Sequence, residues 1–364
     1  MPLLAQPNWT AEQVISPADT SYQVKAIAVS PKDASVWVLA ANIKATPEIA
    51  RLWRVEAGGS NRIAVPLAAT KMERFEGAIC AASDGSVYLV GWMRNRSHLV
   101  RFAPTGETTI RPLGLDGINI MGLEASQHGL LLVGSGNRGG FAARIDEDGR
   151  KLWAIDVDKH PLAAILSSGT MLEDGSTLLA GNVWDFHQGK IGMGRGNTLL
   201  LRVDARGNIV QEKSFPGRIA SAARARGGDF LVVDDPQSYP SDSGPSIPAA
   251  IDPDVYARSF MRLQAWRPNL TLAWTAPLPE FHMQFLHMAI RPGPAGGAVL
   301  IGTGRRFDLI ASEYDGQGRQ VWTTTDPSRQ WSVLWLASSV DSFVLAHQVY
   351  DAEIRIALAG FNLK

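Results

Sequence analysis

The chain has 364 residues, and its 35 Lys and Arg residues balance 35 Asp and Glu residues, so the net charge gives no preference for a nucleic acid or a membrane surface. Hydrophobic residues make up 45% of the chain and charged residues 19%, which is typical of a folded protein. No stretch has the roughly 18 consecutive apolar residues that a membrane-spanning helix needs, so we expect a soluble protein. The length exceeds that of a usual single core and favours two domains or one repetitive architecture.

Along the chain, a strand that ends in arginine and is followed by a turn recurs, as in Leu201-Arg-Val-Asp-Ala-Arg-Gly207. Successive copies are 42 to 60 residues apart. The copies are centred on Arg54, Arg101, Arg144, Arg202, Arg262, Glu313 and Arg355. The sequence therefore contains seven repeat units.

Upstream of most copies, a tight turn leads into an apolar strand, as in Ser83-Asp-Gly-Ser-Val-Tyr-Leu-Val-Gly91. Asp-Gly and Gly-Gly pairs between apolar runs predict hairpins, because such turns need a positive φ. Downstream, a short strand carries Trp153, Trp274 or Trp322. Each unit therefore reads as four short strands, which we name A to D in chain order.

Seven such units predict an all-β fold, a seven-bladed β-propeller of four-stranded blades that forms a single domain. The last unit leaves too little chain for a fourth strand, whereas residues 9–15 have no unit of their own. We expect this N-terminal strand to complete the last blade, which removes two open sheet edges. The predicted blades are 21–68, 71–113, 115–160, 161–216, 217–279, 281–326, and 330–364 together with 7–17.

The phrase Arg-x-Asp-x-x-Gly followed by Leu-Trp resembles the blade signature of bacterial quinoprotein-like (PQQ-type) propellers. The resemblance covers nearly the whole chain and implies the propeller fold. The families that carry this signature include quinone-dependent dehydrogenases and assembly scaffolds. The acidic metal-ligand set and the disulfide that quinone binding would need have no match here, so we predict no cofactor.

The loops between strands B and C differ most in length among the units. They are predicted at 41–50, 93–97, 135–140, 182–197, 234–259 and 303–308. A propeller face that collects insertions is usually its binding face. Basic, acidic and aromatic residues are interleaved there, which suits recognition of a protein surface or an anionic small molecule. The predicted partner-binding residues are Trp92, Arg94, Arg96, Arg138, Trp184, Asp185, Arg195, Tyr239, Asp252, Asp254, Tyr256, Arg305 and Arg306.

Two alternatives stay open for these loop residues. Each charged residue could be a solvated surface charge without a binding role. Trp92 and Trp184 could equally pack the loops onto the blades.

No catalytic residue is predicted. Gly134-Ser-Gly-Asn-Arg-Gly139 fits a dinucleotide-binding pattern, but a strand follows it where a helix is required. The lone Cys80 rules out an internal disulfide and lies in an apolar run, which predicts a buried structural residue. A metal at the mouth of the central channel, held by His282, His287 and Asp234, is kept as an alternative.

The leading functional prediction is a non-enzymatic protein-interaction module, a scaffold or an inhibitor that is monomeric by itself. A metal-dependent hydrolase or lyase is the first alternative, and carbohydrate binding by exposed tryptophans is the second. Leu3-Leu4-Ala5 could be the remnant of a signal cleavage site. We therefore expect a bacterial protein of the periplasm or the cytoplasm, with the periplasm favoured.

Overall fold

The computed structural model describes residues 9–17, 22–42, 44, 49–57, 62–65, 67–159, 162–185, 196–224, 228–235, 261–279, 281, 289–293, 297–303, 309–326, 334–338, 342–350 and 353–362. In this part of the chain there are 28 β-strands and one short 3₁₀ helix, Leu67–Thr70. No helix among the described residues is long and apolar enough to cross a membrane. The expectation of an all-β fold is confirmed for these residues.

The described strands form seven four-stranded sheets, and all strand pairs with a described register are antiparallel. The chain divides into two compact units, which we describe separately. The first, the β2–β9 unit, comprises residues 5–132, 143–152 and 332–364. The second, the β14–β25 unit, comprises residues 1–4, 133–142 and 153–331.

The β2–β9 unit holds three whole sheets. The first has β2 (Tyr22–Val29), β3 (Val36–Asn42), β4 (Ile49–Val55) and β5 (Arg62–Val65). The second has β6 (Arg74–Ala81), β7 (Val87–Met93), β8 (Arg96–Phe102) and β9 (Thr108–Pro112). The third has, in spatial order, β26 (Leu334–Ser338), β27 (Ser342–Tyr350), β28 (Glu353–Asn362) and β1 (Trp9–Pro17).

The β14–β25 unit also holds three whole sheets. They are β14 (Leu162–Met171), β15 (Thr177–Asp185), β16 (Gly196–Val203) and β17 (Ile209–Pro216); β18 (Arg218–Arg224), β19 (Phe230–Asp235), β20 (Arg262–Trp266) and β21 (Leu272–Pro277); and β22 (Ala289–Pro292), β23 (Ala298–Thr303), β24 (Leu309–Tyr314) and β25 (Gln320–Asp326). The remaining sheet has residues in both units. Its strands are β10 (Asn119–Ser126), β11 (Gly129–Gly136), β12 (Gly139–Ile145) and β13 (Lys151–Val157).

The N-terminal strand lies in the same sheet as the last three strands of the chain. β1 pairs antiparallel with β28, from Trp9 opposite Gly360 to Pro17 opposite Glu353. This is the pairing that the sequence predicts. It gives β28 a partner on each side, since β27 pairs along its other edge.

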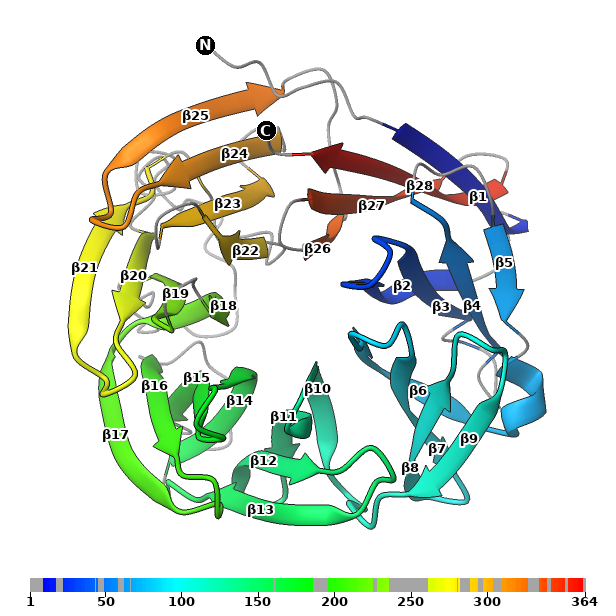
Figure 1. Cartoon of the computed structure of the whole chain (residues 1–364), viewed down its shortest axis with the longest axis horizontal. Helices are drawn as coiled ribbons and strands as arrows, with labels where there is room; N and C mark the ends of the chain where they lie inside the picture. The colour runs from blue at the N-terminus through cyan, green and yellow to red at the C-terminus, as the bar shows by residue number, and fades with distance from the viewer. Residues whose placement is uncertain are drawn as a thin grey trace, which may run out of the picture. The chain divides into compact units, whose positions relative to one another are not determined.

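The first strands of successive sheets lie side by side within each unit (Figure 1). In the β2–β9 unit, β2 contacts both β26 and β6, and β6 contacts β10. In the β14–β25 unit, β18 contacts both β14 and β22. We therefore keep the letters A to D for the four strands of each sheet, with A for these neighbouring first strands.

The core lies between the faces of neighbouring sheets. One cluster joins Trp37, Leu39 and Leu52 of the first sheet to Phe75 and Leu89 of the next. The B strands β3 and β7 are buried over six consecutive residues, whereas the D strand β17 is exposed along nearly its whole length. Burial on both faces explains why the B strands read as continuous apolar runs rather than as an alternating pattern.

The arginine of the repeat phrase has a structural partner in the turn between strands A and B. In the first sheet, Arg54 pairs with Asp33 at 2.5 Å. In the next, Arg101 pairs with Asp84 at 2.9 Å, and its Nε donates to Ser86. These ion pairs join the A–B turn to the end of strand C.

Two further sheets vary this contact. Arg202 pairs with Asp174 at 3.3 Å. Arg144 instead donates from its Nε to the main-chain carbonyl of His128 at 2.8 Å. In these four sheets the repeated arginine therefore has a part in the fold.

The sequence expectation is wrong for one copy, because Arg262 does not occupy the repeat position. In the turn after strand C, the amide of Asp204 bonds to the carbonyl of Asn208, and the amide of Arg267 bonds to that of Thr271 in the same way. Arg267 thus corresponds to Asp204, which places Ala265 and not Arg262 at the repeat position. Arg262 is the first residue of β20, at the opposite end of the strand.

The glycine and the tryptophan of the repeat phrase contact each other across neighbouring sheets. A β-carbon on Gly207, in the turn after β16, would lie only 2.7 Å from the β-carbon of Trp153 in β13. A β-carbon on Gly318, in the turn after β24, would lie 2.5 Å from the indole of Trp274 in β21. The indole of one sheet therefore packs on the glycine turn of the next.

Candidate functional site

The B–C end is the end of each sheet at which strand B turns into strand C. Between β7 and β8 this connection is a two-residue turn, Arg94 and Asn95, with φ of 52° and 60°. Between β11 and β12 it is again two residues, 137 and 138. The expectation of loop insertions at 93–97 and 135–140 is therefore wrong, since the strands continue up to a tight turn.

The two arginines predicted at the first of these turns, Arg94 and Arg96, are exposed. Trp92, predicted beside them, is only 7% exposed, and its indole N–H donates to the Glu76 carboxylate. The guanidinium of Arg74 lies over the indole, 4.6 Å from the ring centroid. Trp92 thus packs against the blade, as one of the two alternatives for this residue predicted. Its buried indole is not presented to a glycan.

Three acidic residues at this end of the sheet are held by hydrogen bonds. Glu73 accepts from the amide of Arg94 at 3.1 Å, and Asp116 accepts from the amide of Ser97 at 3.2 Å. Glu76 accepts from Trp92, as described above. The acidic side chains at this end of the sheet therefore hold the main chain and Trp92 in place, whereas the basic side chains extend outward.

The structure describes only some of the other predicted partner-binding residues. Arg138 is exposed in its two-residue turn. Trp184 and Asp185 lie at the end of β15, where only the main chain is described. The remaining ones lie outside the described residues, namely Arg195, Tyr239, Asp252, Asp254, Tyr256, Arg305 and Arg306.

Asp234, the predicted metal ligand, is fully buried in an ion pair. Its two carboxylate oxygens accept from Nε and Nη2 of Arg262 at 2.9 and 2.8 Å. Gln264 also donates to it at 2.9 Å, and the Trp266 indole donates to Gln264 at 2.8 Å. Burial raises the pKa of Asp234, against the opposing effect of Arg262.

This network gives Asp234 a structural partner for each oxygen. His282 and His287, the two histidines of the predicted metal set, lie outside the described residues. Within the described ranges, no three His, Cys, Asp or Glu side chains are grouped so that they could hold a metal ion. The metal site stays a prediction of the sequence.

Cys80 is buried, as predicted. Burial raises the pKa of its thiol well above the usual range, and the charge of Glu124 adds to this. The thiolate is the nucleophilic form of cysteine, so burial and the raised pKa favour a structural role for Cys80.

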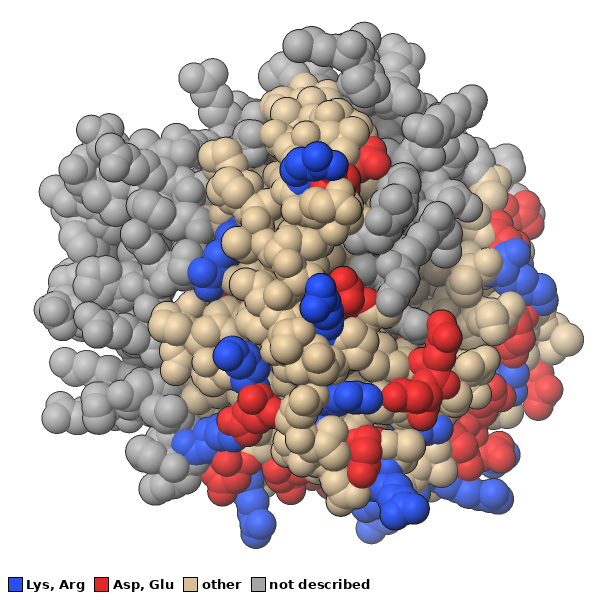
Figure 2. All heavy atoms as spheres, turned by 60° about the vertical axis from the view of Figure 1, so that its left-hand side comes forward, with Lys and Arg blue, Asp and Glu red and all other residues tan. Residues whose placement is uncertain are grey.

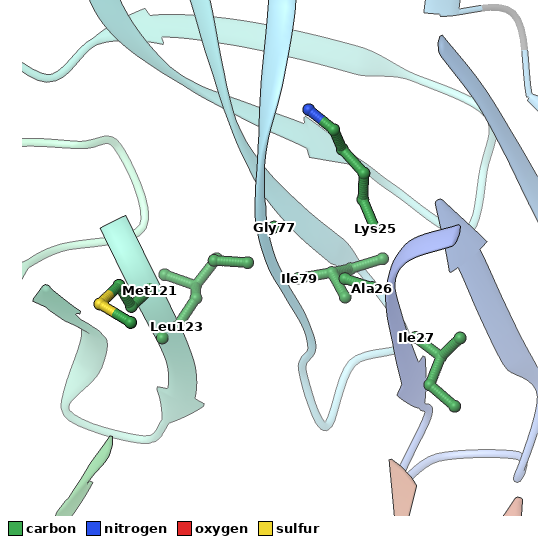
Figure 3. A pocket seen from close by; sticks show the side chains of 9 residues that line it. Lys25, Ala26, Ile27, Gly77, Ile79, Met121 and Leu123 are labelled. Atoms are coloured by element: carbon green, nitrogen blue, oxygen red, sulfur yellow. The ribbon is translucent and has the colours of Figure 1, made fainter. Parts of the chain in front are cut away.

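A pocket of about 260 Å³ lies among the first strands β2, β6 and β10 (Figure 3). It is lined by residues 25–27, 77–79 and 121–123. The ammonium of Lys25 at its edge donates to the carbonyl of Phe75 at 2.7 Å and so joins β2 to β6. Lys25 is the one ionisable residue of this lining, so the pocket offers no acid and base pair for catalysis.

A bulge in β6 shapes this pocket. Phe75 pairs with Gly91 and Ile79 with Leu89, so the three residues 76–78 lie opposite Val90 alone. Bulges bend a strand and leave its extra residues outside the ladder. The bulge thus turns the main chain of Gly77 toward the pocket lining.

The described surface carries both signs of charge. Figure 2 shows basic and acidic side chains interspersed on the face that it presents. This agrees with the balanced net charge of the whole chain. A local group of charges of one sign is therefore a better indicator of a binding site than the net charge.

No protein-family model matches the chain, and no curated protein matches its sequence. Solved structures do resemble it. A selenomethionine-substituted virginiamycin B lyase from Staphylococcus aureus has a TM-score of 0.58 and 12% identity, over 98% of this chain and 100% of that one. A puromycin hydrolase mutant in complex with PGG has a TM-score of 0.59 and 16% identity, over 99% of this chain and 55% of that one.

A third structure, BBS1N in complex with ARL6DN, has a TM-score of 0.51 and 13% identity, over 96% of this chain and 97% of that one. The virginiamycin B lyase and BBS1 structures are β-propellers. The chain therefore has a β-propeller fold. At these identities the likeness shows the fold alone, since a lyase and a propeller in complex with another protein both resemble the chain.

Proposed function

We propose that this protein is a propeller of seven four-stranded blades that binds a partner protein at its B–C end, as a scaffold or an inhibitor, without catalysis. The seven sheets and the pairing of β1 with β28 support the blade count. The resemblance to quinoprotein-like blades is part of the proposal, and the packing roles of the signature residues support it. The compartment stays a prediction of the sequence.

The observation that carries the binding role is a contrast within one sheet. At one end, Arg101 is tied to Asp84 and Ser86 and has a part in the fold. At the B–C end, Arg94 and Arg96 are exposed on a tight turn. Exposed arginines on a rigid support are typical of protein interfaces, because the guanidinium group forms several hydrogen bonds at a small loss of entropy.

Affinity capture from the native host, followed by crosslinking and mass spectrometry, tests this function. The wild-type chain is compared with a variant in which residues 236–256, outside the described residues, are replaced by a Gly-Ser linker. Arg206→Glu, on an exposed turn at the opposite end of its sheet, is the matched control. We expect a partner that crosslinks to the B–C end, is lost with the loop replacement and is retained by the control.

Two results would contradict this function. One is the absence of any partner that the loop replacement affects. The other is equal loss with Arg206→Glu, which would indicate a general charge effect instead of a specific surface.

A further inference from the structure

We infer that Arg74, Arg94 and Arg96, which we call the arginine edge, bind an acidic segment of a partner protein. The inference rests on the proposed function and names the chemistry of the partner. It goes further in assigning the contact to one sheet, β6–β9.

The three residues come from neighbouring positions of this sheet. Arg74 pairs with Trp92 across β6 and β7, and Arg96 pairs with Met93 across β7 and β8. Arg94 lies in the turn between these strands. Because neighbouring strands are about 4.8 Å apart, the three residues lie within a strip ~10 Å wide at the end of the sheet. Arg74, opposite Trp92, and Arg96, opposite Met93, belong to opposite faces of the sheet, because successive residues of a strand alternate in direction. A peptide that crosses the end of the sheet can therefore contact the arginines of both faces.

The acidic groups beside the arginine edge already accept hydrogen bonds within the sheet. Glu73 accepts from the amide of Arg94, and Glu76 accepts from the indole of Trp92. Arg74 is 3.7 Å from Glu76, yet its own side chain is 57% exposed. Among the described ion pairs, none involves the guanidinium of Arg94 or Arg96. The positive charge of these two groups is thus directed to solvent.

Trp92 holds Arg74 in place for a ligand. Its ring lies under the guanidinium at 4.6 Å from the centroid. Stacking on an aromatic face leaves the N–H groups at the rim of the guanidinium directed outward. These groups match the two oxygens of a carboxylate. An acidic side chain of a partner can therefore bind without a large loss of arginine freedom.

The two-residue turn requires a main-chain conformation that is unfavourable for arginine. Arg94 and Asn95 both have positive φ, a conformation that favours Asn and Gly in two-residue hairpins. An arginine at the first position is unfavourable there, and its side chain makes no described contact that would offset the strain. Backbone strain of this kind is frequent at binding sites. Presentation of Arg94 to a partner would explain why an arginine occupies this position.

Fluorescence anisotropy with a labelled eight-residue Glu-rich peptide tests the arginine edge on the full chain. The matched controls are a Gln-rich peptide and the variant Arg206→Glu. We expect the wild type and Arg206→Glu to bind the acidic peptide equally, with an affinity that falls as salt is added. The double variant Arg94→Glu, Arg96→Glu should bind at least 10-fold more weakly.

Unchanged binding by the double variant, or equal binding of the Gln-rich peptide, would overturn the inference. So would a single-stranded oligonucleotide that binds this edge more tightly than the peptide, because the edge would then recognise phosphate. Should the double variant fail to fold by circular dichroism, the single variants Arg94→Gln and Arg96→Gln replace it. Peptide binding in the absence of any captured partner would refute the proposed function alone, and a captured partner that the double variant retains would refute the inference alone.

Discussion

Single side chains of the repeat phrase hold the ends of the sheets together. Asp33 accepts from the amide of Ser35 at 3.0 Å and from Arg54 at 2.5 Å. Burial works to raise the pKa of Asp33, but the hydrogen bonds from Ser35, Ser30 and Arg54 outweigh it and lower the pKa to about 2. The ionised form is therefore favoured in the folded state.

This shift predicts a pH dependence of stability. An unfolded aspartate has a pKa of about 3.9, so the Asp33 contribution is complete above that pH and is lost as the pH falls toward about 2. The side chain is 37% exposed, so solvent screening reduces the contribution to on the order of 1 kcal/mol. Urea unfolding should show Asp33→Asn less stable than wild type near neutral pH, with the difference vanishing in acid. A constant difference at all pH values would contradict this account.

The buried pair of Asp234 and Arg262 makes a second residue-scale prediction. Arg262→Met leaves a carboxylate with no exposed surface without its bidentate partner, and breaking a buried pair in this way costs about 3 kcal/mol or more. Arg206→Met, at an exposed position, should change stability by less than about 0.5 kcal/mol. Chemical denaturation of both variants is the measurement. Similar losses for the two would show that the pair contributes little.

At the scale of elements, the turn after strand C decides how neighbouring sheets pack. Gly207 has a φ of 92°, and Trp153 of the preceding sheet fills the space where a β-carbon would lie. Gly106 occupies a similar turn with a φ of 88°, but no atom lies within 4 Å of its missing β-carbon. Substitutions at the two glycines can therefore separate the effect of backbone conformation on stability from the effect of packing.

Gly106→Ala should lower the free energy of unfolding by about 1 to 2 kcal/mol, because alanine disfavours a positive φ. Gly207→Ala should lower the free energy of unfolding by a further ~1 to 3 kcal/mol, because the indole of Trp153 must move. Thermal or chemical unfolding of the two variants measures the difference. Equal losses would mean that the Trp153 contact does not matter for stability.

The sequence predicts strands well where turn chemistry marks them. The Asp-Gly and Gly-Gly pairs identify the A–B hairpins, and the pairing of β1 with β28 follows from a unit that lacks a strand. The B–C connections of β7 with β8 and of β11 with β12 are mispredicted. Arg94 and Asn95 adopt positive φ without glycine, so the turn signal in the sequence is weak.

At the scale of the whole molecule, β1 covers the outer edge of β28. Removal of residues 1–17 leaves that edge unpaired, which lowers stability and exposes a strand to association with other chains. Removal of residues 1–8 alone, which precede β1, is the matched control. We expect a lower unfolding midpoint and aggregation for the longer truncation only, measured by thermal unfolding with light scattering. Normal behaviour of the longer truncation would show that the last sheet is stable without β1.

The candidate site could be predicted only in part. Exposed basic residues near the B–C ends, such as Arg94, Arg96 and Arg138, are visible in the sequence. The role of Arg74 is not, because only the pairing of β6 with β7 brings it over Trp92. The hydrogen bond from Trp92 to Glu76 likewise joins residues that are 16 positions apart.

By itself, the sequence determined the all-β class, the four-strand unit and the N-terminal strand of the last sheet, because these follow from local turn signals and spacing. Only the tertiary structure decided what the repeated side chains do. It placed Arg54 and Arg101 in ion pairs within the fold, moved the repeat position in the fifth sheet to Ala265, and left Arg94 exposed. The physical reason is that an arginine has the same sequence signal whether its partner is an aspartate across a turn or another molecule.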